Sequence, residues 1–178
     1  MSIGHTAKGA DIYAVTVTDE SATQSVEKNG VFVIGAVNGE PAPVSFLLYT
    51  ISRLLSDYAA GTNDELKLIL KTSELYFIPV VHVDGYKALS DGFLSGETLA
   101  DAYHPKNFAD DAVCVSDSEA SGVNLDRNFP HDWNADDVGS SPDPCSPDYR
   151  GSELFSEPET KRVDDWSIQH PAALGLTY

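Results

Sequence analysis

Glu40 is the residue of this chain whose position points most directly to chemistry. It closes the stretch VNGE (residues 37–40), which follows a run of strand formers at 31–34 and precedes prolines and an apolar segment. A carboxylate just after a buried strand is typical of a ligand or metal site, because open α/β sheets place their crevices there. The alternative is a residue at the start of a helix that faces the positive end of the helix dipole. The position alone leaves both interpretations open.

The histidines and acidic residues offer few further ligand sets. His82 ends a buried apolar run and could be either a substitute metal ligand or a hydrogen-bonded structural residue. His5, His104 and His131 stand in polar segments without ligand spacing. The acidic stretch 132–148 lacks the D-x-D-x-D-G order of a calcium loop, which favours solvated surface.

Two cysteines, Cys114 and Cys145, are too few for a cysteine-only zinc site and too far apart for a C-x-x-C motif. They could be two free buried thiols or one disulfide. A disulfide would indicate an oxidising compartment.

Strand and helix patterns around these residues predict an α/β fold. Residues 11–18 and 30–35 read as strands, and residues 74–83 read as a buried strand closed by a turn at Asp84–Gly85. Apolar spacing of three and four predicts a helix over 42–58, and 64–71 is a shorter helix candidate. Strand, helix, strand with buried strands is typical of a largely parallel sheet with flanking helices. Residues 90–147 lack periodicity and read as a long connection or binding loop.

The composition excludes several classes of partner. The chain has 178 residues, 28 of them acidic and 11 basic, for a net charge of −17. This charge argues against nucleic acid or an anionic membrane as a partner. No window reaches the roughly 18 apolar residues that a membrane span requires, and the first residues show no signal-peptide pattern.

Three segments in order carry a resemblance to a known family: IPVVHVDGY (78–86), GVNLDRNF (122–129) and SSPDPCSPDYRGSELFSEPET (140–160). Together with the strand end before Glu40, they resemble the zinc carboxypeptidases of the M14 type. The resemblance covers nearly the whole chain and implies a single, partial carboxypeptidase-like domain over residues 1–178. It implies that the family's leading helix and C-terminal half have no counterpart here.

The resemblance implies that the zinc site is degraded. The family binds zinc through H-x-x-E and a later His, which leaves a coordination position for the attacking water. Glu40 corresponds to the Glu ligand, whereas Val37 stands at the first His and has no lone pair to offer. The second His and the catalytic Glu would lie beyond residue 178, and the surroundings of His170 do not match the ligand motif. We therefore expect zinc, the family's cofactor, not to bind this chain, and we expect no catalytic residues in it.

Further departures affect the residues around that site. Asn124 occupies the position of the Asp that orients the first His in the family. Asp126 and Arg127 correspond to an Asn-Arg pair that grips the substrate's C-terminal carboxylate, so Arg127 is retained while Asp126 adds a negative charge. Phe108 aligns near a further family Arg. Asp126 and Arg127 are thus the expected substrate-binding residues.

The structural parts of the family pattern match better. The resemblance implies that Cys114 and Cys145 form the family's disulfide. Ser156, Pro158 and Glu159 read as a capping box that starts a helix.

The resemblance therefore implies an M14 metallocarboxypeptidase homologue that is inactive as this chain; the family removes C-terminal residues from peptides with zinc. One alternative is a fragment of an active secreted carboxypeptidase. The other is a noncatalytic module that binds peptide or protein C-termini through Arg127. The family and the disulfide together predict an extracellular or secretory location.

Overall fold

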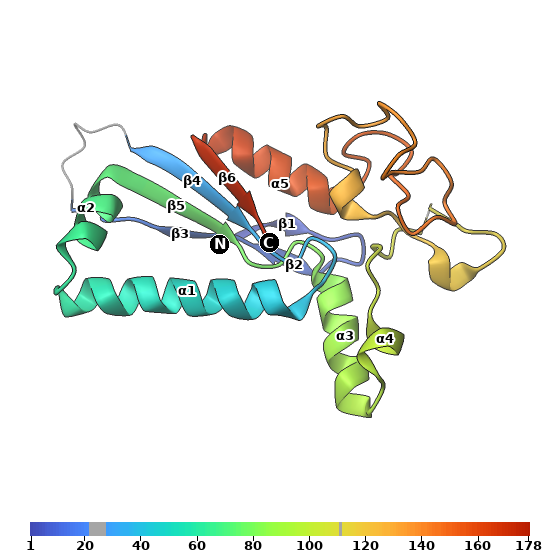
Figure 1. Ribbon diagram of the computed structural model, residues 1–178, viewed down its shortest axis with the longest axis horizontal. Helices are drawn as coiled ribbons and strands as arrows, with labels where there is room; N and C mark the ends of the chain where they lie inside the picture. The colour runs from blue at the N-terminus through green and yellow to red at the C-terminus, as the bar shows by residue number, and fades with distance from the viewer. Residues whose placement is uncertain (22–27, 111) are drawn as a thin grey trace.

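A mixed four-stranded sheet lies between helices in the computed structural model, which describes residues 1–21, 28–110 and 112–178 (Figure 1). The strand order is β3 (Val15–Val17), β5 (Ser73–Ile78), β4 (Asn29–Ile34) and β6 (Leu174–Thr177). Strand β3 runs antiparallel to β5, whereas β5, β4 and β6 are parallel to one another. The predicted α/β class with a largely parallel sheet is confirmed.

A separate hairpin forms before the sheet. Strands β1 (Ser2–His5) and β2 (Asp11–Tyr13) pair with each other and not with the four-stranded sheet. The prediction of one strand over 11–18 is therefore wrong. The buried residue Ala14 separates β2 of the hairpin from β3 of the four-stranded sheet. Its backbone N–H donates to Met1 O at 2.9 Å, and neither residue belongs to a strand.

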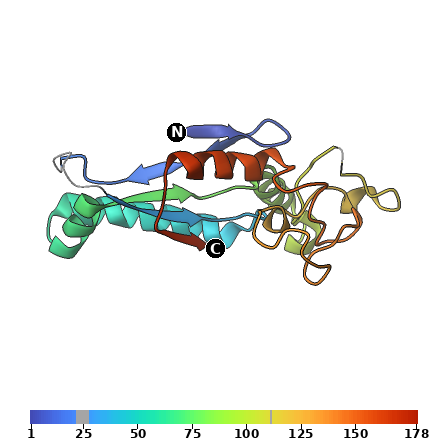
Figure 2. The same cartoon turned by 90° about the horizontal axis from the view of Figure 1, so that it is seen from above.

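Helix α1 (Pro41–Ala60) confirms the longest predicted helix. Its buried face consists of Val44, Leu47 and Ile51, and it ends at Gly61, which adopts φ 68°. Helix α2 (Asp64–Thr72) confirms the second prediction; Asn63 caps it by accepting a hydrogen bond from Leu66 N. Both helices pack on one face of the sheet, opposite helix α5 (Pro158–Gln169) (Figure 2).

Helix α3 (Val83–Ser95) begins where the sequence predicted a turn. Strand β5 ends at Ile78, before Pro79, and Val81 N and His82 N then donate to Gly35 O and Ala36 O. The imidazole of His82 accepts a hydrogen bond from Gly85 N, so Gly85 belongs to the first turn of the helix. The predicted strand over 74–83 is thus too long, and the predicted turn is wrong.

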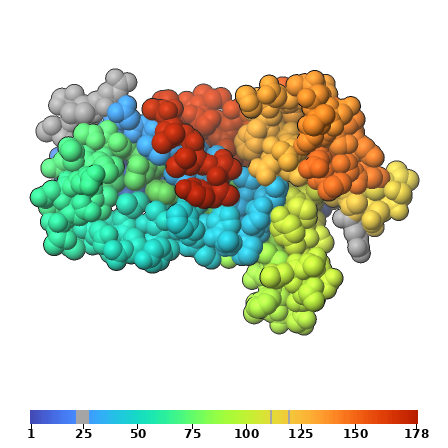
Figure 3. All heavy atoms as spheres, viewed as in Figure 1, coloured from blue at the N-terminus to red at the C-terminus, as the bar shows by residue number. Residues whose placement is uncertain are grey.

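The chain from 90 to 147 is only partly irregular. It contains the end of α3, helix α4 (Leu99–Ala102), and two 3-10 turns, η1 (Ser118–Ala120) and η2 (Leu125–Arg127); Asp111 lies outside the described residues. Helices α3 and α4 project from the body of the molecule (Figures 1 and 3). The predicted disulfide is confirmed: Cys114 and Cys145 are bonded, with Cα atoms 4.7 Å apart.

The start of helix α5 differs from the predicted capping box. Glu157, not Ser156, occupies the N-cap, and its side chain makes no capping bond. Asn128 Oδ1 instead accepts hydrogen bonds from Glu157 N at 3.3 Å and from Thr160 Oγ1 at 2.6 Å. A side chain from a distant segment therefore supplies the cap.

Two apolar clusters hold the sheet between its helices. The cluster between the sheet and helices α1 and α2 includes Leu47, Ile51 and Phe77. The cluster on the other face includes Phe32, Val37 and Trp166. Val37, whose position the family would give to a metal ligand, is therefore a core residue. Across the described ranges, we find no helix with the length and apolar content that crossing a membrane demands.

Candidate functional site

Glu40 lies after β4, at the N-cap position of α1, but its side chain makes no capping bond. Its Oε2 accepts a hydrogen bond from Asn38 N at 3.2 Å, and its Oε1 accepts one from Tyr103 Oη at 3.4 Å. A cavity of about 440 Å³ opens beside it, walled by Leu89, Leu99, Ala100 and Tyr103. The carboxylate therefore faces a cavity and stands at the start of a helix, so both sequence interpretations describe part of its setting.

Asp126 lies close to Glu40 although the two are far apart in the sequence. Asn38 joins them, since its Nδ2 donates to Asp126 Oδ2 at 2.6 Å while its backbone N–H donates to Glu40. Burial and the charge of Glu40 raise the pKa of Asp126, against the opposing effects of Arg127 and Asn38. Two carboxylates therefore share one region of the molecule.

Arg127 lines a different cavity, of about 450 Å³, together with Asp126. Its Nε lies 3.6 Å from Asp148 Oδ1, and its side chain is 44% exposed. Glu40 and Arg127 therefore line two different cavities, and Asn38 links Glu40 of the first to Asp126 of the second. The structure thus brings the expected site residues together without placing them in one pocket.

The other residues that the sequence analysis singled out have structural partners. His82 is buried, its Nδ1 accepts from Gly85 N, and its Nε2 lies 3.1 Å from His104 O. Burial lowers the pKa of this imidazole, which favours the neutral form. Phe108 packs against the rings of His82 and His104. The hydrogen-bonded structural role considered for His82 agrees with these contacts.

The described residues do not fit a catalytic zinc. Such a site takes three protein ligands and leaves one position for water. Val37 is 3% exposed and apolar, both nitrogens of His82 are engaged, and the amide of Asn124 donates to Pro147 O while accepting from Asp126 N. Within the described ranges, no group of three or more His, Cys, Asp or Glu side chains gathers in a metal-binding arrangement.

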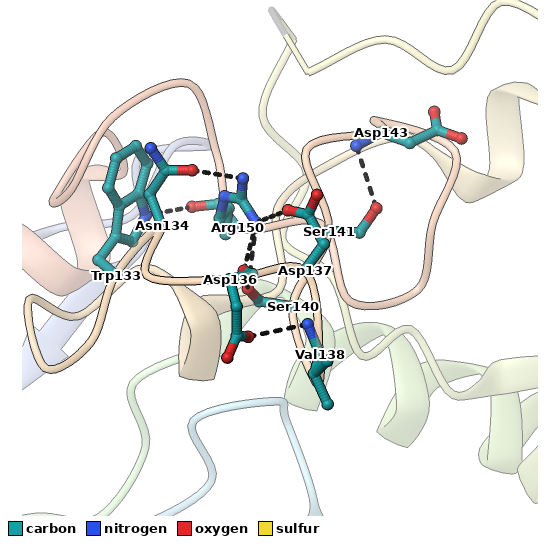
Figure 4. Close-up of polar contacts among 9 residues, drawn as sticks. All are labelled: Trp133, Asn134, Asp136, Asp137, Val138, Ser140, Ser141, Asp143 and Arg150. Atoms are coloured by element: carbon teal, nitrogen blue, oxygen red, sulfur yellow. Dashed lines mark hydrogen bonds and ion pairs between the residues drawn. The ribbon is translucent and has the colours of Figure 1, made fainter.

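Arg150 is a residue whose role the sequence analysis missed. Its side chain is 6% exposed and lies inside the loop 133–140 (Figure 4). The guanidinium donates to Asn134 Oδ1, Asp136 O, Asp137 Oδ1 and Ser140 Oγ. The predicted solvated surface at 132–148 is therefore partly organised around a buried cation. An arginine that follows a cluster of aspartates was the available signal.

Lys106 is a second buried cation that the sequence analysis missed. Its Nζ donates to three backbone carbonyls, those of Ala120, Pro144 at 2.6 Å and Ser146 at 3.1 Å. Burial lowers the pKa of this ammonium. Because Pro144 and Ser146 flank Cys145, Lys106 and the disulfide secure the same segment.

Comparison with known proteins agrees with this fold. The family model described as "Zinc carboxypeptidase" matches residues 1–178, and this chain belongs to that family. Carboxypeptidase A from Helicoverpa armigera superposes with a TM-score of 0.78 at 26% identity, over 99% of this chain and 39% of that one. Thrombin-activatable fibrinolysis inhibitor has the same fold, with a TM-score of 0.77 at 24% identity over 99% of this chain and 40% of that one.

The curated relatives carry a name that bears on activity. A protein of Ajellomyces dermatitidis named "Inactive metallocarboxypeptidase ECM14" is 28% identical over 167 residues, which are 93% of this chain and 26% of that protein. A protein of the same name from Arthroderma otae is 27% identical over 171 residues, 94% of this chain and 26% of that one. The chain therefore spans about a quarter of the length of these relatives.

Proposed function

We propose that this chain is a noncatalytic member of the zinc carboxypeptidase family that neither binds catalytic zinc nor hydrolyses peptides. The observation that carries the proposal is the burial of Val37 in the core, at the position that the family resemblance gives to the first His ligand. The relatives named as inactive metallocarboxypeptidases support it.

The test combines metal analysis with an activity assay on the purified chain. After dialysis against zinc and then against buffer, we expect far less than one zinc per chain. We also expect no release of C-terminal residues from peptides when zinc is added. One tightly bound zinc that is lost in Glu40→Gln, or hydrolysis above background, would overturn the proposal and favour a fragment of an active carboxypeptidase.

A second candidate function is the binding of peptide or protein C-termini by Arg127. The half-exposed guanidinium in a cavity of about 450 Å³ favours it, because arginine suits carboxylate recognition. The test is calorimetry with a short peptide and its C-terminally amidated form. We expect binding of the free carboxylate only, and loss of that binding in Arg127→Met; equal binding of both peptides would contradict this function.

We also propose an extracellular or secretory location. The Cys114–Cys145 disulfide supports it, since disulfides persist mainly in oxidising compartments. Localisation of the tagged natural protein tests it, with a cytosolic signal as the contrary result.

A further inference from the structure

We propose that Arg150 is a positioning residue that holds residues 133–140 as one wall of the Arg127 cavity, and that the aspartates lining this cavity, Asp136 of this wall among them, disfavour peptides whose last side chain is acidic. The inference rests on the second candidate function, the recognition of a peptide C-terminus by Arg127.

The first step is the number of loop groups that Arg150 holds. One guanidinium nitrogen donates to Asp136 O at 3.2 Å, Asp137 Oδ1 at 2.8 Å and Ser140 Oγ at 3.2 Å. The other donates to Asn134 Oδ1 at 2.5 Å (Figure 4). A single side chain thus secures the loop at four residues.

Trp133, at the start of the loop, also contacts Arg150 in two ways. Arg150 O accepts a hydrogen bond from Trp133 Nε1 at 3.1 Å, and the guanidinium lies 5.9 Å from the centre of a Trp133 ring. Trp133 is therefore fixed both by a hydrogen bond and by a cation–π contact.

The backbone of the loop is irregular at its start. Asp132 and Asn134 adopt φ 51° and φ 58°, in the left-handed region that costs free energy for residues other than glycine. Asp and Asn are the residues other than glycine that adopt this region most readily. Arg150 contacts the second of these two residues through the Asn134 side chain.

The second step is the position of this loop relative to Arg127. Trp133, Asp136 and Ser140 line the same cavity as Arg127. All three are among the residues that Arg150 contacts. Displacing the side chain of Arg150 would therefore move the wall that faces Arg127.

The third step is the charge of the cavity. Its lining includes three acidic residues, Asp126, Asp132 and Asp136, beside Arg127 and His131. Asp148 already lies 3.6 Å from the guanidinium of Arg127. One terminal carboxylate can be accommodated by Arg127, but a second anionic group would face several like charges. A neutral or cationic last side chain meets no such repulsion.

A lysine cannot reproduce the geometry of Arg150. The planar guanidinium presents donors in different directions at fixed angles, whereas an ammonium is a single point of charge. Arg150→Lys therefore keeps the charge and removes the multiple attachment. Arg162→Lys is a matched control, because Arg162 is 42% exposed and pairs only with Asp165 among the ion pairs of the described residues.

The experiment measures loop order and peptide binding separately. Hydrogen exchange is followed over residues 133–140, and two otherwise identical peptides that end in Leu or Glu are titrated by calorimetry. In wild type we expect protection of the loop and at least tenfold tighter binding of the Leu peptide. In Arg150→Lys we expect at least tenfold faster exchange in the loop and a Leu-to-Glu preference reduced to below threefold. Arg162→Lys should leave both measurements unchanged.

Asp137→Asn is a milder variant for the case in which Arg150→Lys does not fold. Asp137→Asn removes one charged partner, and we expect a smaller rise of exchange confined to the same loop. Unchanged loop exchange in folded Arg150→Lys would overturn the positioning role, and equal binding of the Leu and Glu peptides by wild type would overturn the charge selection. If wild type binds neither peptide, the second candidate function and the charge selection both fail, while the exchange data still decide whether Arg150 positions the loop.

Discussion

Asn38 donates a 2.6 Å hydrogen bond from its side-chain amide to Asp126 Oδ2, across 88 residues of sequence. Its backbone N–H also donates to Glu40 Oε2. One residue therefore donates to both carboxylates of the candidate site, one from each of the two cavities.

We expect Asn38→Ala to lower the free energy of unfolding by about 0.5–1.5 kcal/mol, because it removes a hydrogen bond that joins two distant segments at an exposed carboxylate. A double-mutant cycle with Asp126→Ala should give a coupling free energy of about 1 kcal/mol. Chemical denaturation of the four proteins measures it. A coupling indistinguishable from zero would show that the contact does not hold the two segments together.

Val37→His tests whether the missing ligand alone accounts for the lost metal site. We expect no stoichiometric zinc, since the introduced imidazole and Glu40 would supply two ligands where catalytic zinc takes three. The variant should also be less stable by about 1–3 kcal/mol, because it places a polar ring in the core cluster. Metal analysis and thermal unfolding check both statements, with Val37→Ala as the control for lost packing. One zinc per chain would refute this account of the site.

Glu159 predicts a pH dependence of stability. The side chain is fully buried, accepts from Ala7 N at 2.9 Å, and shares Asn107 Nδ2 with Glu157. Burial raises its pKa above the ordinary value of 4.5, against the effect of these hydrogen bonds. Its contribution to stability is therefore complete below about pH 4.5 and is lost as pH rises through the folded-state pKa.

The measurement is the free energy of unfolding between pH 4 and 8, compared with Glu159→Gln. In wild type, this group should contribute a decline of up to about 1.4 kcal/mol per pH unit within its titration range. The variant should lack that component, while Glu153→Gln, at an exposed position, should keep it. Identical pH profiles for wild type and Glu159→Gln would contradict the expectation.

Lys106→Met should destabilise the fold by about 2–4 kcal/mol, since three backbone carbonyls would lose a charged donor. Lys87→Met is the control: that side chain is 70% exposed and pairs only with the nearby Asp91 among the described ion pairs. We expect a change within about 0.5 kcal/mol there. Denaturant unfolding of both variants makes the comparison, and equal effects would refute a special role for Lys106.

The sequence predicted those parts of the fold that depend on local patterns. The stripe that includes Val44, Leu47 and Ile51 defined α1, and the shorter candidate over 64–71 is found as α2. The family motifs predicted the Cys114–Cys145 pairing. In each case the relevant information lay within one helix or within a recognisable motif.

The errors arise where distant groups satisfy the backbone. Asp84–Gly85 looks like a turn locally. In the structure, the backbone N–H groups of residues 81 and 82 donate to Gly35 O and Ala36 O, and the side chain of His82 then caps α3. Ser156 looks like the N-cap of α5, yet the capping oxygen comes from Asn128, which lies 29 residues before Glu157 in the sequence. The loop around Arg150 looked solvated because no local rule places a buried guanidinium among its aspartates.

The three carbonyls around Lys106 have a consequence for redox chemistry. Reduction of Cys114–Cys145 would cut the covalent link but leave Pro144 and Ser146, on either side of Cys145, attached to the ammonium together with Ala120. The two thiols would then stay close at a high effective concentration. An external disulfide would oxidise the pair in two exchanges: one thiol would attack it, form a mixed disulfide and release the first external thiol, and the neighbouring thiol would then displace the second and re-form Cys114–Cys145. The mixed disulfide would therefore be short-lived.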